Sequence, residues 1–220
     1  MIKKYLYLRS KFHNMQQFDP RQTVIPPCIP RTHSRFGRWL GKALLRAMGW
    51  RVAGAFPSTS KFVAAVAPHT SNWDFIIGIA VKLSLGVKIR FLGKHTIFIW
   101  PFGMLLRHWG GIPVDRRAAN GVVGEAGAIF AAHEQLILGI APEGTRKYSK
   151  EWKTGFLHIA KAANVPVVPM ALDYRNKTFV VMPEEYLGDD LGAELQRIKA
   201  LFPIEMAKYP EQVSGQQHKS

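Results

Sequence analysis

The sequence predicts an α/β domain in which a mostly parallel sheet is flanked by helices. Two observations carry this prediction. Short apolar runs of strand length alternate along the chain with longer segments that have helical periodicity. The chain has 220 residues and is 47% hydrophobic, which is enough for one domain with a sizeable core.

The apolar runs that predict strands are separated by Gly, Pro and polar residues. The first run, KFVAAVA, is uninterrupted and is therefore typical of a strand that is buried on both faces. We expect strands at residues 61–67, 88–93, 111–115, 135–144, 165–172 and 178–182, the fourth of which continues into a loop.

Helical segments lie between these strands. The segment NWDFIIGIAVKLSLG, residues 72–86, places Asp74 in its first turn and ends on Gly86, which is a common helix stop. The segment 96–110 has helical character but is interrupted by Pro101. Further helices are expected at residues 118–134, 154–164 and 191–202.

Residues 35–52 are basic and amphipathic. Phe36, Trp39 and other apolar residues recur at helical spacing, and Arg and Lys residues fall between them. Two interpretations stay open. The helix either packs on the core in the ordinary way, or lies on a membrane with its apolar face in the acyl region and its cations at the headgroups. Both can hold in part.

Composition divides the chain into four parts. Residues 1–34 are polar and basic and contain four prolines, so we expect an extended or disordered basic arm. Residues 35–52 form the amphipathic membrane-surface helix. Residues 53–210 form the α/β domain, and residues 211–220 form a flexible tail.

The charge of the chain is strongly one-sided. The net charge is +15, and residues 1–120 contain 19 Lys and Arg but only 3 Asp and Glu. A positive field of this kind suits a polyanionic partner such as nucleic acid, an anionic membrane surface or a phosphorylated substrate. Charge alone does not choose among these three.

Several classes of protein are disfavoured. The single cysteine, Cys28, can form neither an intrachain disulfide nor a Cys-based metal site. No apolar run approaches the roughly 18 residues of a transmembrane helix. The basic N-terminal residues are not followed by the apolar segment of a signal peptide.

The stretch APHTSNWDF places His69 in a loop and Asp74 on the first turn of the helix that follows. From there the carboxylate can hold the imidazole from behind, fix its tautomer and stabilise the imidazolium. A histidine held in this way is a general base for a hydroxyl or a water. The alternative is that Asp74 is only a favourable helix N-terminal charge.

Two rival uses of nearby residues are weaker. Ser71 could be a nucleophile, but no G-x-S-x-G motif surrounds it, and its spacing from Asp74 favours a helix cap. His95 and His108 could join His69 at a metal, but no H-E-x-x-H motif or Cys/His cluster supports a metal site. We therefore expect no metal.

Two further stretches suit an anion. In APEGTRKYSK, Gly144 lets the backbone approach a ligand, Thr145 offers a hydroxyl, and Arg146 offers a planar guanidinium suited to phosphate. In GGIPVDRR, Arg116 and Arg117 follow a tight turn. Each stretch could also be an ordinary solvated basic loop, so neither decides the function alone.

Together the motifs carry a resemblance. APHTSNWD, GGIPVDRR, APEGTR and VPVVPMAL, in this order and at these separations, resemble the four blocks of the glycerolipid acyltransferase family, in particular its 1-acylglycerol-3-phosphate acyltransferase group. The resemblance covers about residues 61–175. No single block is specific, but the set of four is. It implies the α/β fold of these enzymes, a glycerol-3-phosphate acyltransferase-like domain.

The resemblance also assigns residues. His69 matches the catalytic base of the family and Asp74 its partner. Lys94 resembles a family lysine that precedes the second block. Pro166 and Pro169 match a block that shapes the acyl-donor pocket. The positions credited with holding the acceptor phosphate are matched by Arg116, Glu143, Gly144, Thr145 and Arg146.

The activity that the resemblance implies is transfer of a fatty acyl group from acyl-CoA or acyl-carrier protein to a lysophospholipid, namely 1-acyl-sn-glycerol-3-phosphate, in phospholipid biosynthesis. It implies no cofactor beyond the acyl donor, and a peripheral or monotopic place on the cytoplasmic face of an anionic membrane. Lys147 stands where the family often has serine, and this departure leaves the identity of the acceptor open.

The alternatives are another lysolipid acceptor, a lipid transacylase or hydrolase that uses the same histidine, and a basic nucleic-acid-binding module. The chain lacks the signatures of the common nucleic-acid-binding motifs, so we expect no nucleic acid partner.

Overall fold

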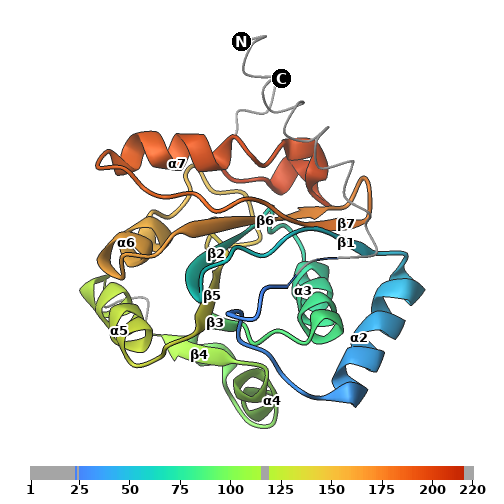
Figure 1. Ribbon diagram of the computed structural model, residues 1–220. Coiled ribbons are helices and arrows are strands. Elements are labelled where there is room, and N and C mark those ends of the chain that lie inside the picture. Colours follow the sequence, from blue (N-terminus) through green and yellow to red (C-terminus); the bar gives the residue numbers. More distant parts are fainter. Residues whose placement is uncertain (1–22, 24, 115–118, 216–220) are drawn as a thin grey trace.

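A seven-stranded sheet forms the centre of the computed structural model, which describes residue 23, residues 25–114 and residues 119–215. The strand order is β1-β7-β6-β2-β5-β3-β4, and every neighbouring pair is parallel except β6 with β7. The predicted mostly parallel sheet is therefore confirmed (Figure 1). The strands are β1 (Arg51–Gly54), β2 (Lys61–Ala67), β3 (Arg90–Lys94), β4 (Gly111–Val114), β5 (Leu136–Ile140), β6 (Val167–Asp173) and β7 (Thr178–Val181).

Helices flank the sheet on both sides. In Figure 1, α2 and α3 lie on one side, α5 and α6 lie on the other, and α7 runs along the top. The predicted helix at 96–110 is interrupted at Pro101 as expected, because a short 3-10 turn (His95–Ile97) precedes α4. The α-helices are α2 (Arg35–Met48), α3 (Asn72–Leu85), α4 (Phe102–His108), α5 (Ala119–Ala131), α6 (Gly155–Ala162) and α7 (Leu191–Lys199).

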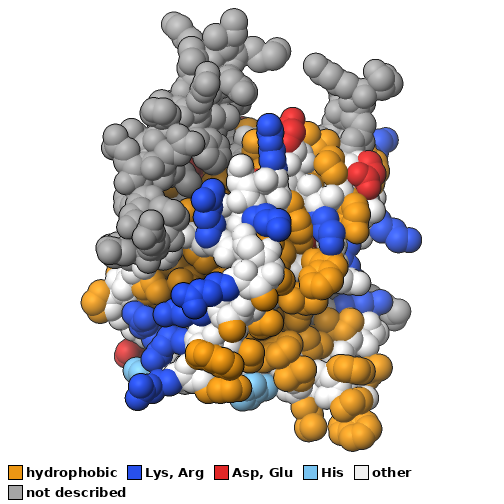
Figure 2. Space-filling model, turned by 90° about the vertical axis from the view of Figure 1, so that its right-hand side faces the viewer, with side chains coloured by type: hydrophobic (Ala, Val, Ile, Leu, Met, Phe, Trp, Pro, Cys, Tyr) orange, Lys and Arg blue, Asp and Glu red, His pale blue; other side chains and the backbone are white. Residues whose placement is uncertain are grey.

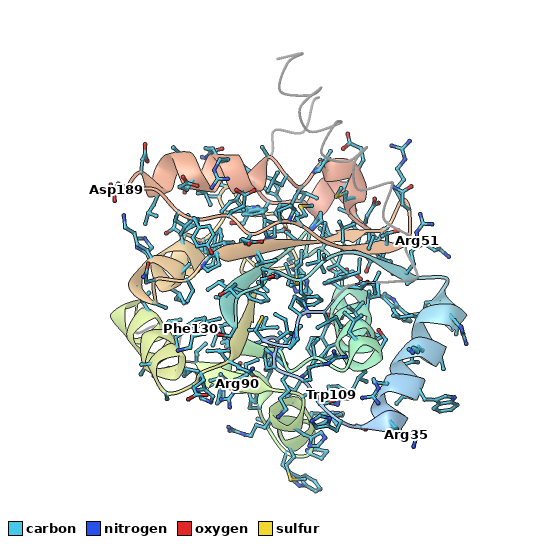
Figure 3. The ribbon with its side chains drawn as sticks, in the orientation of Figure 1. Arg35, Arg51, Arg90, Trp109, Phe130 and Asp189 are labelled. Atoms are coloured by element: carbon cyan, nitrogen blue, oxygen red, sulfur yellow. The ribbon has the colours of Figure 1, made fainter. Side chains whose placement is uncertain are left out.

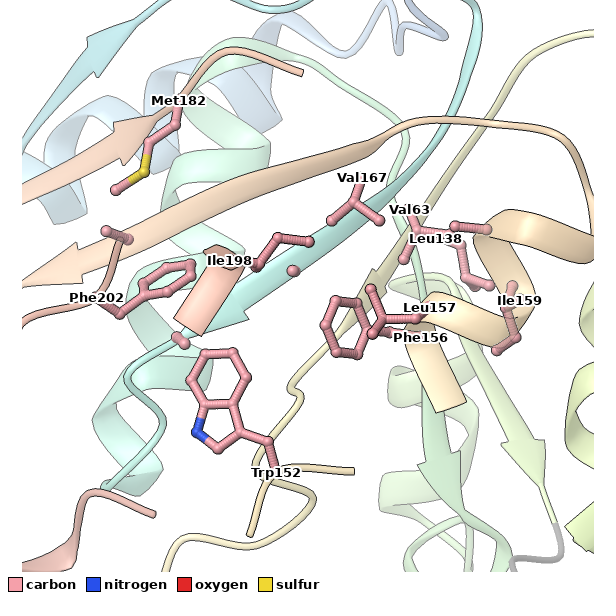
Figure 4. Close-up of a cluster of buried hydrophobic side chains, with 14 of the residues drawn as sticks. Val63, Leu138, Trp152, Phe156, Leu157, Ile159, Val167, Met182, Ile198 and Phe202 are labelled. Carbon is pink, nitrogen blue, oxygen red and sulfur yellow. The ribbon is translucent and has the colours of Figure 1, made fainter. Parts of the chain in front are cut away.

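Strand β2 is buried on both faces, as its uninterrupted apolar sequence predicts. Val63 and Ala65 pack into one hydrophobic cluster with residues of α5, α6 and α7, whereas Phe62 and Ala64 pack into a second cluster with residues of α2 and α3. Figure 3 labels Phe130 on the α5 side of the sheet, and Figure 4 shows the first cluster in close-up. The central strand is thereby held rigidly on both sides.

Helix α3 begins and ends where its local sequence directs. The Ser71 side chain accepts a hydrogen bond from Trp73 N at 3.2 Å, and the Asp74 carboxylate accepts one from Ser71 N at 2.8 Å. This reciprocal pair is a capping box. At the other end Gly86 has φ of 65°, in the left-handed region that favours glycine. The predicted helix over residues 72–86 is therefore confirmed to within one residue.

The amphipathic helix is shorter than predicted. Gly49, with φ of 71°, ends α2, and the residues that follow pair with β7 as the edge strand β1. The expectation that the helix reaches residue 52 is therefore wrong. Val52 fits both a helical and an extended pattern, and only its pairing with Phe179 of β7 decides between them.

Helix α2 packs on α3 through small residues. Gly41 and Leu45 are buried in this contact, and a Cβ added to Gly41 would lie only 2.3 Å from Ser84 N. The larger side chains Phe36 and Trp39 stay 70% and 63% exposed, and their rings stack with centroids 5.9 Å apart. One face of the helix thus packs on the core, while much of its apolar surface faces outward.

The segment before α2 belongs to the domain. Ile29 is only 1% exposed and lies in the hydrophobic cluster with residues of α2 and α3. Lys88 N also donates a hydrogen bond to Pro30 O at 2.8 Å. The prediction of an extended or disordered arm over residues 1–34 is therefore wrong for residues 25–34. Composition alone does not show that one apolar residue of a polar segment packs into the core.

Candidate active site

Three adjacent strands bring the polar side chains of the site to one edge of the sheet. β2 lies between β5 and β6 and is parallel to both, so the carboxyl ends of all three meet there. His69 follows β2, Glu143 follows β5 and Tyr174 follows β6. His69 and Glu143 share one site, because His69 N donates a hydrogen bond to Glu143 Oε1 at 2.5 Å.

His69 and Asp74 are in direct contact. The distance from His69 Nδ1 to Asp74 Oδ2 is 3.1 Å, the imidazole is 23% exposed and the carboxylate only 1%. Because Nδ1 faces the carboxylate, it keeps its proton, and Nε2 offers a lone pair. Asp74 can then stabilise the imidazolium that forms when Nε2 accepts a proton. This is the geometry of a general base with its orienting acid.

The Asp74 carboxylate has three partners. Oδ2 accepts from Ser71 N in addition to facing His69, and Oδ1 accepts a hydrogen bond from the phenol of Tyr174. Asp74 therefore caps α3 and braces the histidine at once, so the two interpretations of this residue do not exclude each other. The interpretation of Ser71 as a helix cap is confirmed, because its hydroxyl accepts from Trp73 N.

Glu143 supports the loop that carries His69 from inside the protein. It is 0% exposed, its Oε1 accepts from His69 N, and its Oε2 accepts from Ser214 N at 3.3 Å. Burial raises the pKa of Glu143, and the backbone N–H groups of His69 and Ser214 oppose that rise. The expectation that this side chain holds a phosphate is therefore wrong, since the carboxylate is buried against the loop that it supports.

The turn after Glu143 faces outward. Gly144 has φ of 67°, a backbone conformation that favours glycine, and the side chains of Thr145 and Arg146 are exposed. Arg116, the other predicted phosphate-binding cation, lies outside the described residues. A phosphate-binding role for these residues stays a prediction.

Residues 211–215 tie the two loops of the site together. With its side-chain amide assigned so that nitrogen, and not oxygen, faces the two loops, Gln212 donates to Thr70 O at 3.1 Å and to Arg146 O at 2.7 Å; only this assignment satisfies both carbonyls. Ser214 is 0% exposed and contributes the N–H that reaches the buried glutamate. The prediction of a flexible tail is wrong for this segment, because its polar composition hides the buried partners that the fold supplies.

The comparison with known families identifies the family of proteins that carries this site. The family model described as Acyltransferase matches residues 52–173, which is more than half of the chain. The chain belongs to the acyltransferase family. The matched region contains the His69–Asp74 pair and the Gly144–Arg146 turn, so both lie in the part of the enzyme that the family shares.

Similar proteins agree with this assignment. The acyltransferase is 27% identical over 196 residues to the 1-acyl-sn-glycerol-3-phosphate acyltransferase of Escherichia coli K12, covering 84% of this chain and 75% of that one. It is 28% identical over 144 residues to the enzyme of the same name from Haemophilus influenzae, covering 60% and 58% of the two chains.

A solved structure shares the fold. The crystal structure of the 1-acyl-sn-glycerophosphate acyltransferase PlsC from Thermotoga maritima superposes with a TM-score of 0.52 at 18% identity, covering 76% of this chain and 78% of that one. At this identity the likeness supports the fold, including its mostly parallel sheet with flanking helices.

Three residues that the resemblance assigned to the acyltransferase's substrates lie in different surroundings. Lys94 is exposed at the carboxyl end of β3, on the same sheet edge as His69. Pro166 precedes β6 at the opposite edge, and Pro169 lies within β6 opposite Ala65 of β2. Both prolines are buried beside or within the central strand β6, and a part for their block in shaping the acyl-donor pocket stays a prediction.

The sequence-based interpretation missed Tyr174 and Ser214. A signal for Tyr174 existed, because it directly follows an apolar strand and therefore belongs to the same class of position as His69 and Glu143. No comparable signal marked Ser214, which is one polar residue among several. Among the residues that the structure describes, no group of three or more His, Cys, Asp or Glu side chains could hold a metal ion.

Proposed function

We propose that this acyltransferase moves a fatty acyl group from the thioester of acyl-CoA or acyl-carrier protein to a lysophospholipid hydroxyl in phospholipid biosynthesis, with 1-acyl-sn-glycerol-3-phosphate as the acceptor. The observation that carries the proposal is the His69–Asp74 pair, in which a buried carboxylate lies 3.1 Å from the imidazole of a partly exposed histidine. The names of the relatives from Escherichia coli and Haemophilus influenzae support the choice of acceptor.

The proposed reaction needs one base and no covalent enzyme intermediate. Nε2 of His69 takes the proton of the acceptor hydroxyl as its oxygen attacks the thioester carbonyl carbon. The tetrahedral intermediate then collapses with breakage of the C–S bond, and the departing sulfur receives the proton from the imidazolium. The products are the new ester and a free thiol, and Asp74 stabilises the imidazolium in between.

The exposed turn beside His69 supplies the recognition step of the proposal. The exposed Arg146 side chain offers a planar, permanently charged fork for a phosphate monoester, and Arg116 is proposed to contact the same group. Holding the phosphate fixes the glycerol backbone, so the hydroxyl is presented to His69 in a reactive orientation.

We propose that the enzyme works on the cytoplasmic face of an anionic membrane as a peripheral protein. Figure 2 shows hydrophobic side chains gathered on one face, with Lys and Arg around them. Several large exposed apolar side chains come from α2 and from the segment at α4, namely Phe36, Trp39, Ile99, Trp100 and Phe102. Apolar anchors with adjacent cations are the requirement of an interfacial site. Within the described ranges, no helix has the length and apolar character needed to cross a membrane.

The test of the reaction is direct. Purified protein is incubated with labelled acyl-CoA or acyl-carrier protein and a panel of lysolipids, and the labelled products are identified. His69→Ala is expected to lower kcat by about 100- to 10,000-fold. His158→Ala, an exposed histidine on α6, serves as the matched control. Wild-type turnover by His69→Ala would refute the mechanism, and release of free fatty acid without an acceptor would indicate a hydrolase.

The membrane proposal has its own test. The double variant Trp100→Ser/Phe102→Ser is expected to lose at least about tenfold in its affinity for anionic vesicles, because two large apolar anchors are removed. Tyr186→Ser is the control, since this aromatic residue is 68% exposed but lies outside α2 and α4. Equal vesicle binding by both variants would contradict the proposed membrane contact.

A further inference from the structure

Tyr174 lies at this site, but the proposed reaction gives it no part. It follows β6 immediately and is half-buried. Its ring meets Trp50 edge-on, with centroids 4.9 Å apart and an interplanar angle of 85°, and its backbone N donates to Met206 O at 2.9 Å. Both its ring and its backbone are therefore fixed by packing before any substrate binds.

The phenol of Tyr174 is directed at the carboxylate that holds His69. Its hydroxyl donates to Asp74 Oδ1, while Oδ2 is used by Ser71 N at 2.8 Å and faces His69 Nδ1 at 3.1 Å. The Asp74 side chain is only 1% exposed, so water cannot easily replace a lost donor. Each carboxylate oxygen thus accepts a hydrogen bond, and within the described part of the chain the donor to Oδ1 is the phenol of Tyr174.

We propose that Tyr174 is a positioning residue for acyl transfer: its phenol fixes the plane of the Asp74 carboxylate and draws negative charge from it, and so sets the basicity of His69. The proposal rests on the proposed role of His69 as the general base. Tyr174 itself touches neither substrate nor the reacting atoms, and it acts through Asp74.

The direction of proton donation follows from the surroundings of the phenol. Burial raises the pKa of Tyr174 above its ordinary value, and the hydrogen bond to Asp74 and the charge of Asp74 raise it further. The phenol therefore keeps its proton throughout the working pH range. It donates to the carboxylate, and it never competes with His69 as a base.

The effect on His69 has a definite sign. A carboxylate that shares its charge with a phenol stabilises the neighbouring imidazolium less than a carboxylate without that donor. Loss of the phenol should therefore make His69 more basic, and the acid limb of the rate profile should move to higher pH. At the same time the freed carboxylate can rotate, which misaligns the imidazole and lowers kcat.

Other charged or titratable groups face this assembly. Glu143 contacts His69 through the backbone N–H. Lys208 lies with its Nζ 6.0 Å from the centre of the Tyr174 ring, and Tyr209 borders the same ammonium group at 5.6 Å. A change from Tyr174 to Phe keeps the ring and leaves these groups in place, so a pH shift in that variant reports the lost hydroxyl.

The experiment compares Tyr174→Phe with wild type, and uses Tyr209→Phe as the matched control. Tyr209→Phe removes a phenol beside the same Lys208, but its hydroxyl has no hydrogen bond to Asp74 among those of the described residues. For Tyr174→Phe we expect kcat to fall about tenfold with KM nearly unchanged, and the acid limb of kcat/KM to rise by about one pH unit. The control should match wild type in both respects.

A second readout does not depend on turnover. The midpoint of the His69 imidazole titration, followed by NMR, should move to higher pH in Tyr174→Phe. Replacing Tyr174 alone with 3-fluorotyrosine, a stronger donor of the same shape, should move the midpoint and the acid limb to lower pH. This variant keeps the test informative if Tyr174→Phe does not fold.

The outcomes are separable. If Tyr174→Phe is less stable but its pH profile and His69 titration superpose on those of wild type, the tyrosine has only a structural role and the proposal is overturned. A fluorotyrosine form with no shift in either readout would overturn it as well. Full activity of His69→Ala would refute the proposed function instead, while the NMR titration would still report whether Tyr174 tunes His69.

Discussion

Gly41→Ala tests whether the close contact between α2 and α3 depends on the absence of a side chain. A Cβ added at Gly41 would lie 2.3 Å from Ser84 N, 2.7 Å from Ala80 O and 2.8 Å from the carbonyl carbon of Leu83. All three are backbone atoms of α3, so no side chain can rotate away. To restore an ordinary contact, α2 must move by about 1 Å.

The size of the effect follows from two opposing contributions. Overpacking of this kind costs about 1–3 kcal/mol. Alanine is favoured over glycine in a helix interior by about 1 kcal/mol, which offsets part of that cost. The free energy of unfolding should therefore fall by up to about 2 kcal/mol. Because α2 carries the exposed Phe36 and Trp39, its displacement should also weaken binding to anionic vesicles.

Urea denaturation at constant pH measures the first effect, and vesicle sedimentation measures the second. Gly78→Ala is the matched control, because Gly78 lies in α3 and a Cβ there would meet no atom within 4 Å. This variant should be more stable than wild type by up to about 1 kcal/mol. If Gly41→Ala were as stable as Gly78→Ala, the inferred role of Gly41 in helix docking would be refuted.

Three further predictions concern the site and the pH dependence of stability. Because burial raises the pKa of Glu143 above the ordinary 4.5, its folded state binds the proton more tightly than its unfolded state, so stability should fall as pH rises from about 4.5 through the raised value. Glu143→Gln stays neutral, so its free energy of unfolding should lack this fall with pH. Urea denaturation at several pH values measures it, and the same fall in the variant as in wild type would contradict the reasoning. Arg146→Ala should raise KM for the acceptor at least about tenfold and leave KM for the donor nearly unchanged, because a phosphate contact serves the acceptor alone; equal effects on both substrates would argue against that contact. Ser71→Ala should lower stability by about 1 kcal/mol through loss of the cap of α3, measured by thermal or urea unfolding, and a variant as stable as wild type would contradict the capping role.

Sequence patterns located most of the secondary structure because those patterns are local. The apolar run of β2 and the capped segment of α3 each carry their own signals, namely strand length, a Ser71 cap and a terminal Gly86. The edge strand β1 was missed because its identity depends on a partner, β7, more than 120 residues later.

At the site, too, the local contact could be predicted, whereas the role of a residue distant in sequence could not. The pairing of His69 with Asp74 could be predicted because one loop and one helical turn separate them. Glu143 could be placed near His69 by the rule that parallel strands end together, but its role could not. Its carboxylate faces inward to the backbone N–H groups of His69 and Ser214, and a loop sequence alone does not show which way a side chain faces.

By itself the sequence determined the α/β character, the pairing of His69 with Asp74, and the family, because each depends on short stretches of chain. Only the tertiary structure decided which residues surround that pair. The strand order β6-β2-β5 places Tyr174 and Glu143 on either side of the His69 loop, and the final segment adds Ser214. These contacts join residues 71 to 100 positions apart, so they exist only once the sheet has assembled.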